Sequence, residues 1–214
     1  MAGCQVMPGI CLFWSLGERM NAWSERYEAA LILAVRAHRQ QVRKGSDIPY
    51  IVHPVHVSAI LLRYGFSEEA AIAGLLHDVV EDQDVPLAHI QAGFGPAVAE
   101  MVAVLSERKR EGGDERPWEV RKQEKIEQLR QASLEAVAVK AADTLHNVRS
   151  MESGLREQGP SFWGHFKRGP GPSLWYYQSV AGIVRERLGA HPLADELDRA
   201  VEELKRAVGS MEGE

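Results

Sequence analysis

Histidine and carboxylate side chains gather in one short stretch, residues 73–82, which reads AGLLHDVVED. On a helix, residues four apart lie one above the other, so His77 would stack with Glu81 and Asp78 with Asp82. Three carboxylates this close repel one another unless positive charge lies among them. A divalent metal ion would supply that charge. A lone His-Asp pair at a helix end is otherwise ordinary surface polarity, so a metal site needs further ligands from elsewhere in the chain.

Two residues of ligand type stand elsewhere in the sequence. His53 directly precedes Pro54, a residue suited to the first turn of a helix. Asp143 lies in a run of Ala, Val and Leu, where a carboxylate needs a partner. The candidate ligands are therefore His53, His77, Asp78 and Asp143. This nitrogen and oxygen set suits Mn²⁺, Fe²⁺, Zn²⁺ or Mg²⁺ and leaves room for a water, whose proton Glu81 or Asp82 could accept.

The elements that must position these residues are expected to be helices. Apolar residues recur at helical spacing from Trp23 to about Arg43, and Arg36, Arg39 and Arg43 would share a face of its last turns. Ser67 is a suitable cap for a central helix that reaches the His-Asp pair. Further helices are expected at 53–64, 97–107, 117–129, 134–151 and 174–188, with a short one after Pro86 and another at the C-terminus. No stretch alternates convincingly as a strand, so the predicted class is all-α.

The sequence predicts a single compact domain over residues 21–210. Residues 1–20 would form an N-terminal extension that is disordered in part. The charged, Gly-containing segment 108–116 is expected to be an exposed loop. A second irregular segment, 159–172, is rich in Gly and Pro and could reshape a pocket.

Composition limits the classes of function. The chain has 214 residues, is 45% hydrophobic and 26% charged, and carries a formal charge of −5, which argues against non-specific nucleic-acid binding. A polyanionic substrate would therefore need a local group of Lys and Arg. Cys4 and Cys11 are the only cysteines, so we expect no disulfide framework and a cytoplasmic location. The N-terminus makes a poor signal peptide, and no membrane partner is expected.

Three separated blocks carry a family resemblance: HRQQVRKGSDIPYIVHP at 38–54, LLHDVVEDQDV at 75–85 and VKAADTLHNVRSM at 139–151. Their order and spacing resemble the HD-domain metal phosphohydrolases. The resemblance is more specific to the hydrolase domain of the RelA/SpoT alarmone enzymes and to the stand-alone small alarmone hydrolases. It covers roughly residues 25–150.

The resemblance implies a helical HD domain in which the four candidate ligands hold Mn²⁺, with other divalent metals as alternatives. It implies that Glu81 and Asp82 position and activate the water. Arg43 would stack on a purine, Lys44 and Ser46 would lie beside it, and Asn147 would contact the sugar or base. The partner implied is a small-molecule nucleotide, and the oligomeric state is left open.

The activity implied is removal of the 3′-diphosphate of guanosine alarmones such as ppGpp. The alternatives are an adenosine alarmone or another nucleotide phosphate at the same metal centre, or a catalytically silent nucleotide-binding regulator. The family usually has a basic residue directly after the metal aspartate, where this chain has Thr144. That departure and the segment 159–172 affect the prediction of which substrate is bound more than the prediction of which reaction is catalysed.

Overall fold

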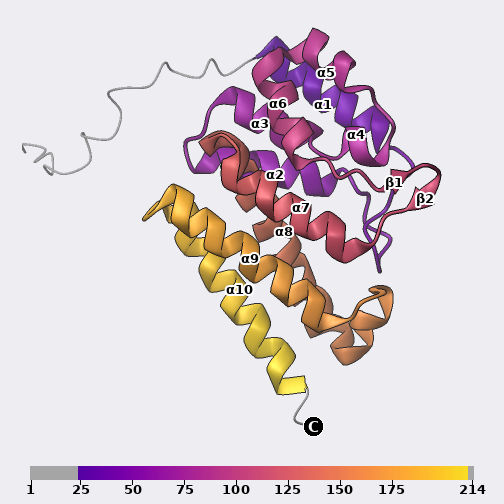
Figure 1. Ribbon diagram of the computed structural model, residues 1–214, viewed down its shortest axis with the longest axis vertical. Helices are drawn as coiled ribbons and strands as arrows, with labels where there is room; N and C mark the ends of the chain where they lie inside the picture. Colours follow the sequence, from indigo (N-terminus) through magenta and orange to yellow (C-terminus); the bar gives the residue numbers. More distant parts are fainter. Residues whose placement is uncertain (1–23, 212–214) are drawn as a thin grey trace, which may run out of the picture.

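Helices build almost the whole of the protein, as the sequence predicts (Figure 1). The computed structural model describes residues 24–211, so the predicted extension at residues 1–20 lies outside the described residues. The first half of the described chain forms α1 (Glu25–Ala37), α2 (Val52–Arg63), α3 (Glu68–Leu76), α4 (Val79–Asp82), α5 (Leu87–Phe94) and α6 (Pro96–Leu105). The second half forms β1 (Arg110–Glu111), β2 (Asp114–Glu115), α7 (Trp118–Gln131), α8 (Leu134–Gln158), the 3-10 helix η1 (Gly159–His165), α9 (Pro170–Leu188) and α10 (Pro192–Met211). Within this range, no helix has both the length and the apolar character needed to cross a bilayer.

Serine caps fix the starts of α1, α3 and α8. The Oγ atoms of Ser24, Ser67 and Ser133 accept hydrogen bonds of 3.2, 3.1 and 3.2 Å from backbone N–H groups in the first turns of α1, α3 and α8. Each bond satisfies a donor that has no partner within its own helix, which typically stabilises a helix by about 1 kcal/mol.

Helix α3 lies at the centre of the core and is buried from Ala70 to Leu76. It packs against α1, α2, α6 and α8. Gly74 allows α2 to approach closely, because a Cβ at this position would lie 2.8 Å from Leu61 Cδ1 and 3.3 Å from Ser58 Cα. This approach holds the first turn of α2, which carries His53, near the end of α3, which leads into His77.

Helix α8 is the long element on which the C-terminal half is assembled. Its buried side contacts α2 and α3, while α9 and α10 pack together along it (Figure 1). Helix α10 is strongly amphipathic, with Leu193, Leu197 and Leu204 fully buried on one face. Asp143 lies in the middle of α8, so the same helix carries core residues and a candidate ligand.

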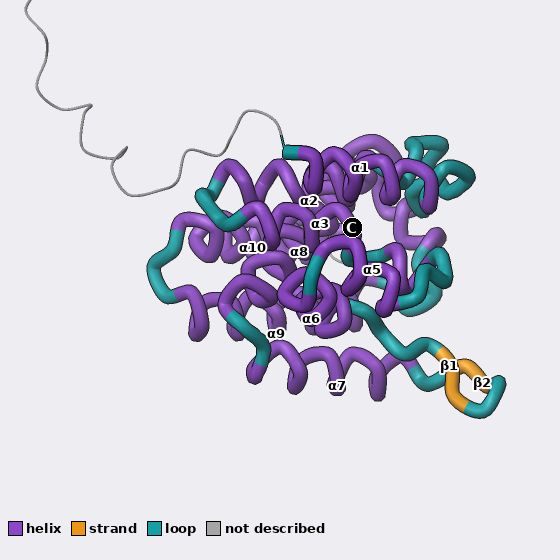
Figure 2. Tube along the Cα trace, turned by 90° about the horizontal axis from the view of Figure 1, so that it is seen from above, coloured by secondary structure: helices purple, strands orange, loops and turns teal. Residues whose placement is uncertain are grey.

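Two regions differ from the sequence-based expectation. Helix α1 ends at Ala37, so Arg39 and Arg43 lie on the following loop and not on a helical face. Backbone hydrogen bonds of 2.8 Å from Arg43 N to Ile48 O and from Tyr50 N to Gln41 O fold this segment back on itself, and they compete with continuation of the helix. The charged segment 108–116 is exposed as predicted, but it contains the small β1–β2 hairpin, which projects from the helical body (Figure 2).

The Gly/Pro-rich segment after α8 is packed against the body of the protein. Phe162 of η1 is buried and lies directly over Gly154 of α8. A Cβ on Gly154 would lie 2.2 Å from Phe162 Cε2, which is closer than any two such atoms can approach. The glycine therefore provides the space that seats η1 on α8.

We expect Gly154→Ala to destabilise the protein, although Ala is favoured over Gly within a helix by about 1 kcal/mol. Overpacking of a buried ring typically costs about 1–3 kcal/mol, and the melting temperature should fall by about 2–4 °C for each net kcal/mol lost. The matched control is Gly182→Ala in α9, where no atom lies within 4 Å of the added Cβ. That variant should melt at or above the wild-type temperature. A Gly154→Ala protein as stable as the control would show that η1 is not seated in this way.

Candidate active site

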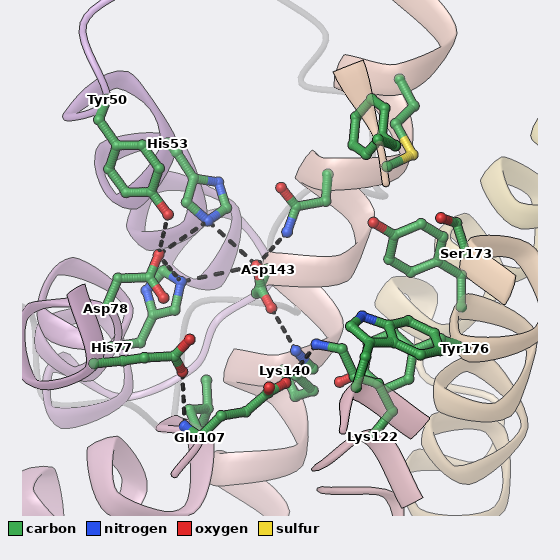
Figure 3. A pocket seen from close by; sticks show the side chains of 17 residues that line it. Tyr50, His53, His77, Asp78, Glu107, Lys122, Lys140, Asp143, Ser173 and Tyr176 are labelled. Carbon is green, nitrogen blue, oxygen red and sulfur yellow. Dashed lines mark hydrogen bonds and ion pairs between the residues drawn. The ribbon is translucent and has the colours of Figure 1, made fainter. Parts of the chain in front are cut away.

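Ligand atoms from the four predicted metal residues face the same small space (Figure 3). His53 Nε2 lies 3.2 Å from Asp143 Oδ1 and 3.6 Å from Asp78 Oδ2. His77 Nε2 lies 3.0 Å from Asp78 Oδ2 and 3.8 Å from Asp143 Oδ1. Atoms held about 2.1 Å from one divalent ion at angles of roughly 90–110° would be about 3.0–3.4 Å apart. One ligand atom each of His53, His77 and Asp143 lies within 4.8 Å of the other two, so these three residues fit a metal ion, and Asp78 lies beside both histidines.

A break between α3 and α4 makes this convergence possible. The sequence predicted a continuous helix through His77 and Asp78, but α3 ends at Leu76 and α4 begins at Val79. Neighbouring side chains on a continuous helix point about 100° apart. In the turn between the two helices, both side chains approach a common point. His77 and Asp78 still have right-handed helical backbone angles, and Asp82 N donates a 2.9 Å hydrogen bond to Asp78 O.

Hydrogen bonds on the outer side of the histidines turn their Nε2 atoms towards this point. His77 Nδ1 lies 2.8 Å from the Gly74 carbonyl oxygen, and His53 Nδ1 lies 2.9 Å from His146 Nδ1. Burial, with the nearby His53 ring, lowers the pKa of His146 to about 3, so His146 is neutral and its Nδ1 can accept a hydrogen bond from His53 Nδ1–H. Outer contacts of this kind orient histidines that bind metals. His77 Nε2 is buried and makes no hydrogen bond. Burial disfavours the charged ring, but Asp78 and Asp143 raise the pKa of His77, so a metal ion bound at Nε2 would replace a proton.

The two carboxylates of this group are held ionised. Burial opposes the charge of Asp78, but the neighbouring His77 keeps its pKa well below the usual range. Tyr50 also donates a 2.6 Å hydrogen bond to Asp78 Oδ2. Burial likewise opposes ionisation of Asp143, and Lys140, whose Nζ lies 2.7 Å from Asp143 Oδ2, keeps the pKa of this carboxyl low.

The predicted catalytic pair occupies two different environments. Glu81 lines the same cavity as the four candidate ligands, whereas Asp82 does not line it. Glu81 Oε2 accepts a 2.7 Å hydrogen bond from the Glu107 N–H, and burial raises the pKa of the Glu81 carboxyl. Lys109 joins the pair, because its Nζ lies 3.0 Å from Glu81 Oε1 and 2.6 Å from Asp82 Oδ1. Asp82 is therefore linked to the cavity through Lys109, which also contacts Glu81.

The cavity has a volume of about 250 Å³, and part of its wall is basic. Figure 3 shows Lys122 and Lys140 close to Tyr176, away from His53. Their Nζ atoms lie 4.5 and 5.4 Å from the centre of the Tyr176 ring. Lys122 is also paired with Glu107. This basic wall was not predicted from the sequence. The spacing of Lys140 three residues before Asp143 on a helix was a usable signal, but nothing in the sequence places Lys122 beside them.

Of the predicted substrate residues, Asn147 alone lines this cavity. Its side chain donates a 2.6 Å hydrogen bond to Asp143 Oδ1 and accepts one of 2.8 Å from Arg43 Nη2. Arg43 therefore lies at the edge of the site. Lys44 Nζ lies over the Phe166 ring, 4.5 Å from its centre, in a neighbouring cavity. Ser46 is exposed, lines neither cavity and donates to the Arg43 carbonyl oxygen, so its observed contact shapes the loop.

Comparison with known proteins gives consistent similarities. An HD-domain family model matches residues 30–162. The chain is 31% identical over 185 residues to mouse guanosine-3′,5′-bis(diphosphate) 3′-pyrophosphohydrolase MESH1, covering 83% of this chain and 94% of the mouse protein. It is 34% identical over 128 residues to a Haemophilus influenzae protein of the same enzymatic name, covering 57% of this chain and 18% of that protein.

The structure is similar to a solved one described as a metazoan ortholog of SpoT that hydrolyses ppGpp. The TM-score is 0.67 at 27% sequence identity, covering 86% of this chain and 97% of the other. The first bacterial relatives are much longer, and the chain spans only about a fifth of their length.

The HD-domain match covers more than half of the chain, and the mouse relative is matched over nearly its full length. The chain therefore belongs to the HD-domain family, together with the guanosine-3′,5′-bis(diphosphate) 3′-pyrophosphohydrolases.

Proposed function

We propose that this chain is a metal-dependent hydrolase that removes the 3′-diphosphate of guanosine 3′,5′-bis(diphosphate), or of its 5′-triphosphate form, and releases pyrophosphate. The observation that carries the proposal is a cavity with two chemically different sides. His53, His77, Asp78 and Asp143 line one part, and Lys122 and Lys140 line another. The first set suits a divalent ion and the second suits phosphate. The names of the mouse and bacterial relatives support the choice of substrate.

The four ligands would hold one divalent ion, and we take Mn²⁺ as that ion from the family resemblance. When bound, such an ion supplies Lewis acidity to a water and to phosphate oxygens. The imidazole and carboxylate donors are also acceptable to Fe²⁺, Zn²⁺ and Mg²⁺.

Glu81 is the group that we assign to accept the proton of the attacking water. It lines the cavity, and burial raises the pKa of its carboxyl towards the range useful for a general base. Asp82 would act indirectly by holding Lys109, which in turn contacts Glu81 Oε1. The attack forms a bond from the water oxygen to the phosphorus next to the 3′ oxygen, and the bond from that phosphorus to the 3′ oxygen breaks.

Lys122 and Lys140 would face the diphosphate that leaves. Thr144, which follows the metal aspartate, is buried and supplies no charge. Lys140 lies three residues before Asp143 on the same helix, and its ammonium contacts the Asp143 carboxylate. Although burial opposes its charge, Asp143 raises the pKa of Lys140 above its usual value. The positive charge that Thr144 lacks would thus come from two lysines elsewhere in the cavity.

The nucleoside would lie towards Arg43 and Asn147, which are joined by a hydrogen bond at the edge of the cavity. A guanidinium is planar and can stack on a purine, while the amide can contact the sugar or base. Lys44 would lie beside the nucleotide, and Ser46 would support the loop that carries these residues.

The metal assignment predicts about one divalent ion per chain and loss of activity in chelator. His53→Ala and Asp143→Ala should lose the ion, so added Mn²⁺ should raise the melting temperature of the wild type but not of these variants. Metal content by elemental analysis and thermal shift with and without Mn²⁺ would measure both effects. His89→Ala, a change of an exposed histidine in α5, is the control and should behave like wild type. Full turnover by metal-free protein would contradict the assignment.

The general-base assignment predicts that Glu81→Gln keeps its metal and binds substrate but loses at least ~10²-fold in kcat, a typical size for acid–base assistance. The amide retains an oxygen that can accept from the Glu107 N–H but cannot accept the water proton at neutral pH. Steady-state kinetics and metal content should be measured together, with Glu111→Gln in the exposed hairpin as the control. Loss of metal from Glu81→Gln would mean that Glu81 is a ligand and not a base.

The stacking assignment predicts that Arg43→Ala raises KM roughly tenfold, the effect of a cation–π contact of about 1–2 kcal/mol, with a much smaller change in kcat. Both purines present similar ring faces, so the guanosine compound and its adenosine counterpart should be affected alike. Arg36→Ala, which changes an exposed arginine of α1, should leave KM unchanged. If wild type hydrolyses a simple phosphate ester as well as it hydrolyses either nucleotide, the site does not recognise a nucleotide.

A further inference from the structure

Lys125 of α7 is a buried lysine that takes no part in the proposed reaction. Its side chain is 4% exposed. Its Nζ donates hydrogen bonds of 2.7 Å to the Val104 carbonyl oxygen, 2.6 Å to the Ser106 carbonyl oxygen and 2.9 Å to Gln128 Oε1. No carboxylate lies within ion-pair distance of this ammonium among residues 24–211. All three donors are therefore used, and two of them hold one short piece of backbone at the end of α6.

The ammonium of Lys125 stays mostly protonated at pH 7 although it is buried. Burial, followed by repulsion from Lys140, lowers its pKa to about 8. Lys122 adds to this shift, whereas Glu107 and Glu81 oppose it. A buried charge is costly unless its hydrogen bonds are made. The end of α6 supplies acceptors for it, because the last turn of a helix has unpaired carbonyl groups and partial negative charge.

The Ser106–Glu107 peptide group lies between Lys125 and Glu81. Its carbonyl oxygen accepts a hydrogen bond from Lys125, and its N–H donates a 2.7 Å hydrogen bond to Glu81 Oε2. The C=O and N–H of a trans peptide point in opposite directions, so one planar group joins the ammonium to the carboxylate. A cation at the carbonyl end polarises the peptide and makes its N–H a stronger donor, because hydrogen bonds in a chain strengthen one another. Lys125 therefore favours the charged form of Glu81 without contacting it.

The side chain of Glu107 is held by the same helix as its backbone. Its carboxylate is paired with Lys122, and Arg121 Nη1 lies 2.7 Å from Glu107 Oε2. Both partners lie about one turn before Lys125 on α7. Glu107 also lines the candidate active site (Figure 3). Helix α7 thus fixes both ends of the residue whose N–H contacts Glu81.

We propose that Lys125 is a positioning residue that holds the Glu81 carboxylate in place through the Ser106–Glu107 peptide group. The inference rests on the proposed function, in which Glu81 accepts the proton of the attacking water. A carboxylate can do so only when it is ionised and aimed at the water. Lys109 contacts Glu81 Oε1, whereas the peptide held by Lys125 contacts Oε2. The two oxygens are therefore held from separate elements.

The test is a double-mutant cycle between Lys125→Met and Glu81→Gln, with steady-state kinetics of metal-loaded protein on guanosine 3′,5′-bis(diphosphate). Methionine is similar to lysine in length but has no charge and no N–H. With Glu81 present, Lys125→Met should lower kcat roughly tenfold, the size of one hydrogen bond to a charged group, and change KM little. In the Glu81→Gln background, the same change should lower kcat less than about twofold, because residues that act as a unit have non-additive effects.

Gln128→Ala is the matched control. It removes one acceptor of Lys125 but leaves both contacts with the backbone at the end of α6, so kcat should stay within about twofold of wild type. Metal content and melting temperature would establish that each variant is folded. If Lys125→Met does not fold, Lys125→Gln, which has an amide N–H but no charge, takes its place in the cycle.

An unchanged kcat in the Lys125 variant would overturn the inference and leave the proposed function standing. So would an equal fold loss of kcat with and without Glu81, or an equal loss in Gln128→Ala, since either result would mean that Lys125 serves only to stabilise the fold. If Glu81→Gln is as active as wild type, the assignment of the base is wrong and the inference falls with it. If wild type does not hydrolyse the compound, the proposed function itself is wrong.

Discussion

The carboxylates of Asp78, in the turn between α3 and α4, and of Asp143, on α8, both lie near His53 Nε2, and their repulsion must be offset by positive charge. The rest of the site can be understood from this requirement. His53 and His77 turn their Nε2 atoms to the same point, and Lys140 neutralises the outer oxygen of Asp143. The core provides the rigidity, because close packing of α2 on α3 at Gly74 keeps the two histidines together.

Positive charge is also placed beside this point. Lys122 and Lys140 line the same cavity as the carboxylates. A protein with a formal charge of −5 thus places two lysines beside its candidate metal site. Two ammonium groups close together can bind a small polyanion such as a diphosphate.

Much of the fold follows from local sequence signals. Helices α1, α3 and α8 begin at serine caps, and α5, α8 and α9 end at glycine; both features are visible in the sequence. The four candidate ligands were identifiable because buried carboxylates and a histidine before proline are unusual in such helices. The break after Leu76 was not predicted, since it depends on tertiary packing and on Asp78 meeting Tyr50 and His77. The basic wall was missed for the same reason, because Lys122 reaches the site only through packing of α7 against its neighbours.

The most direct test of the central claim is to follow where the water oxygen goes. Metal-loaded protein should be incubated with guanosine 3′,5′-bis(diphosphate) in ¹⁸O-enriched water, and the products identified by mass spectrometry. The proposed chemistry predicts GDP with an unlabelled 3′-hydroxyl and pyrophosphate that carries one ¹⁸O atom. Release of orthophosphate from the 5′ end, label in the 3′-hydroxyl, or no turnover with any divalent metal would contradict it.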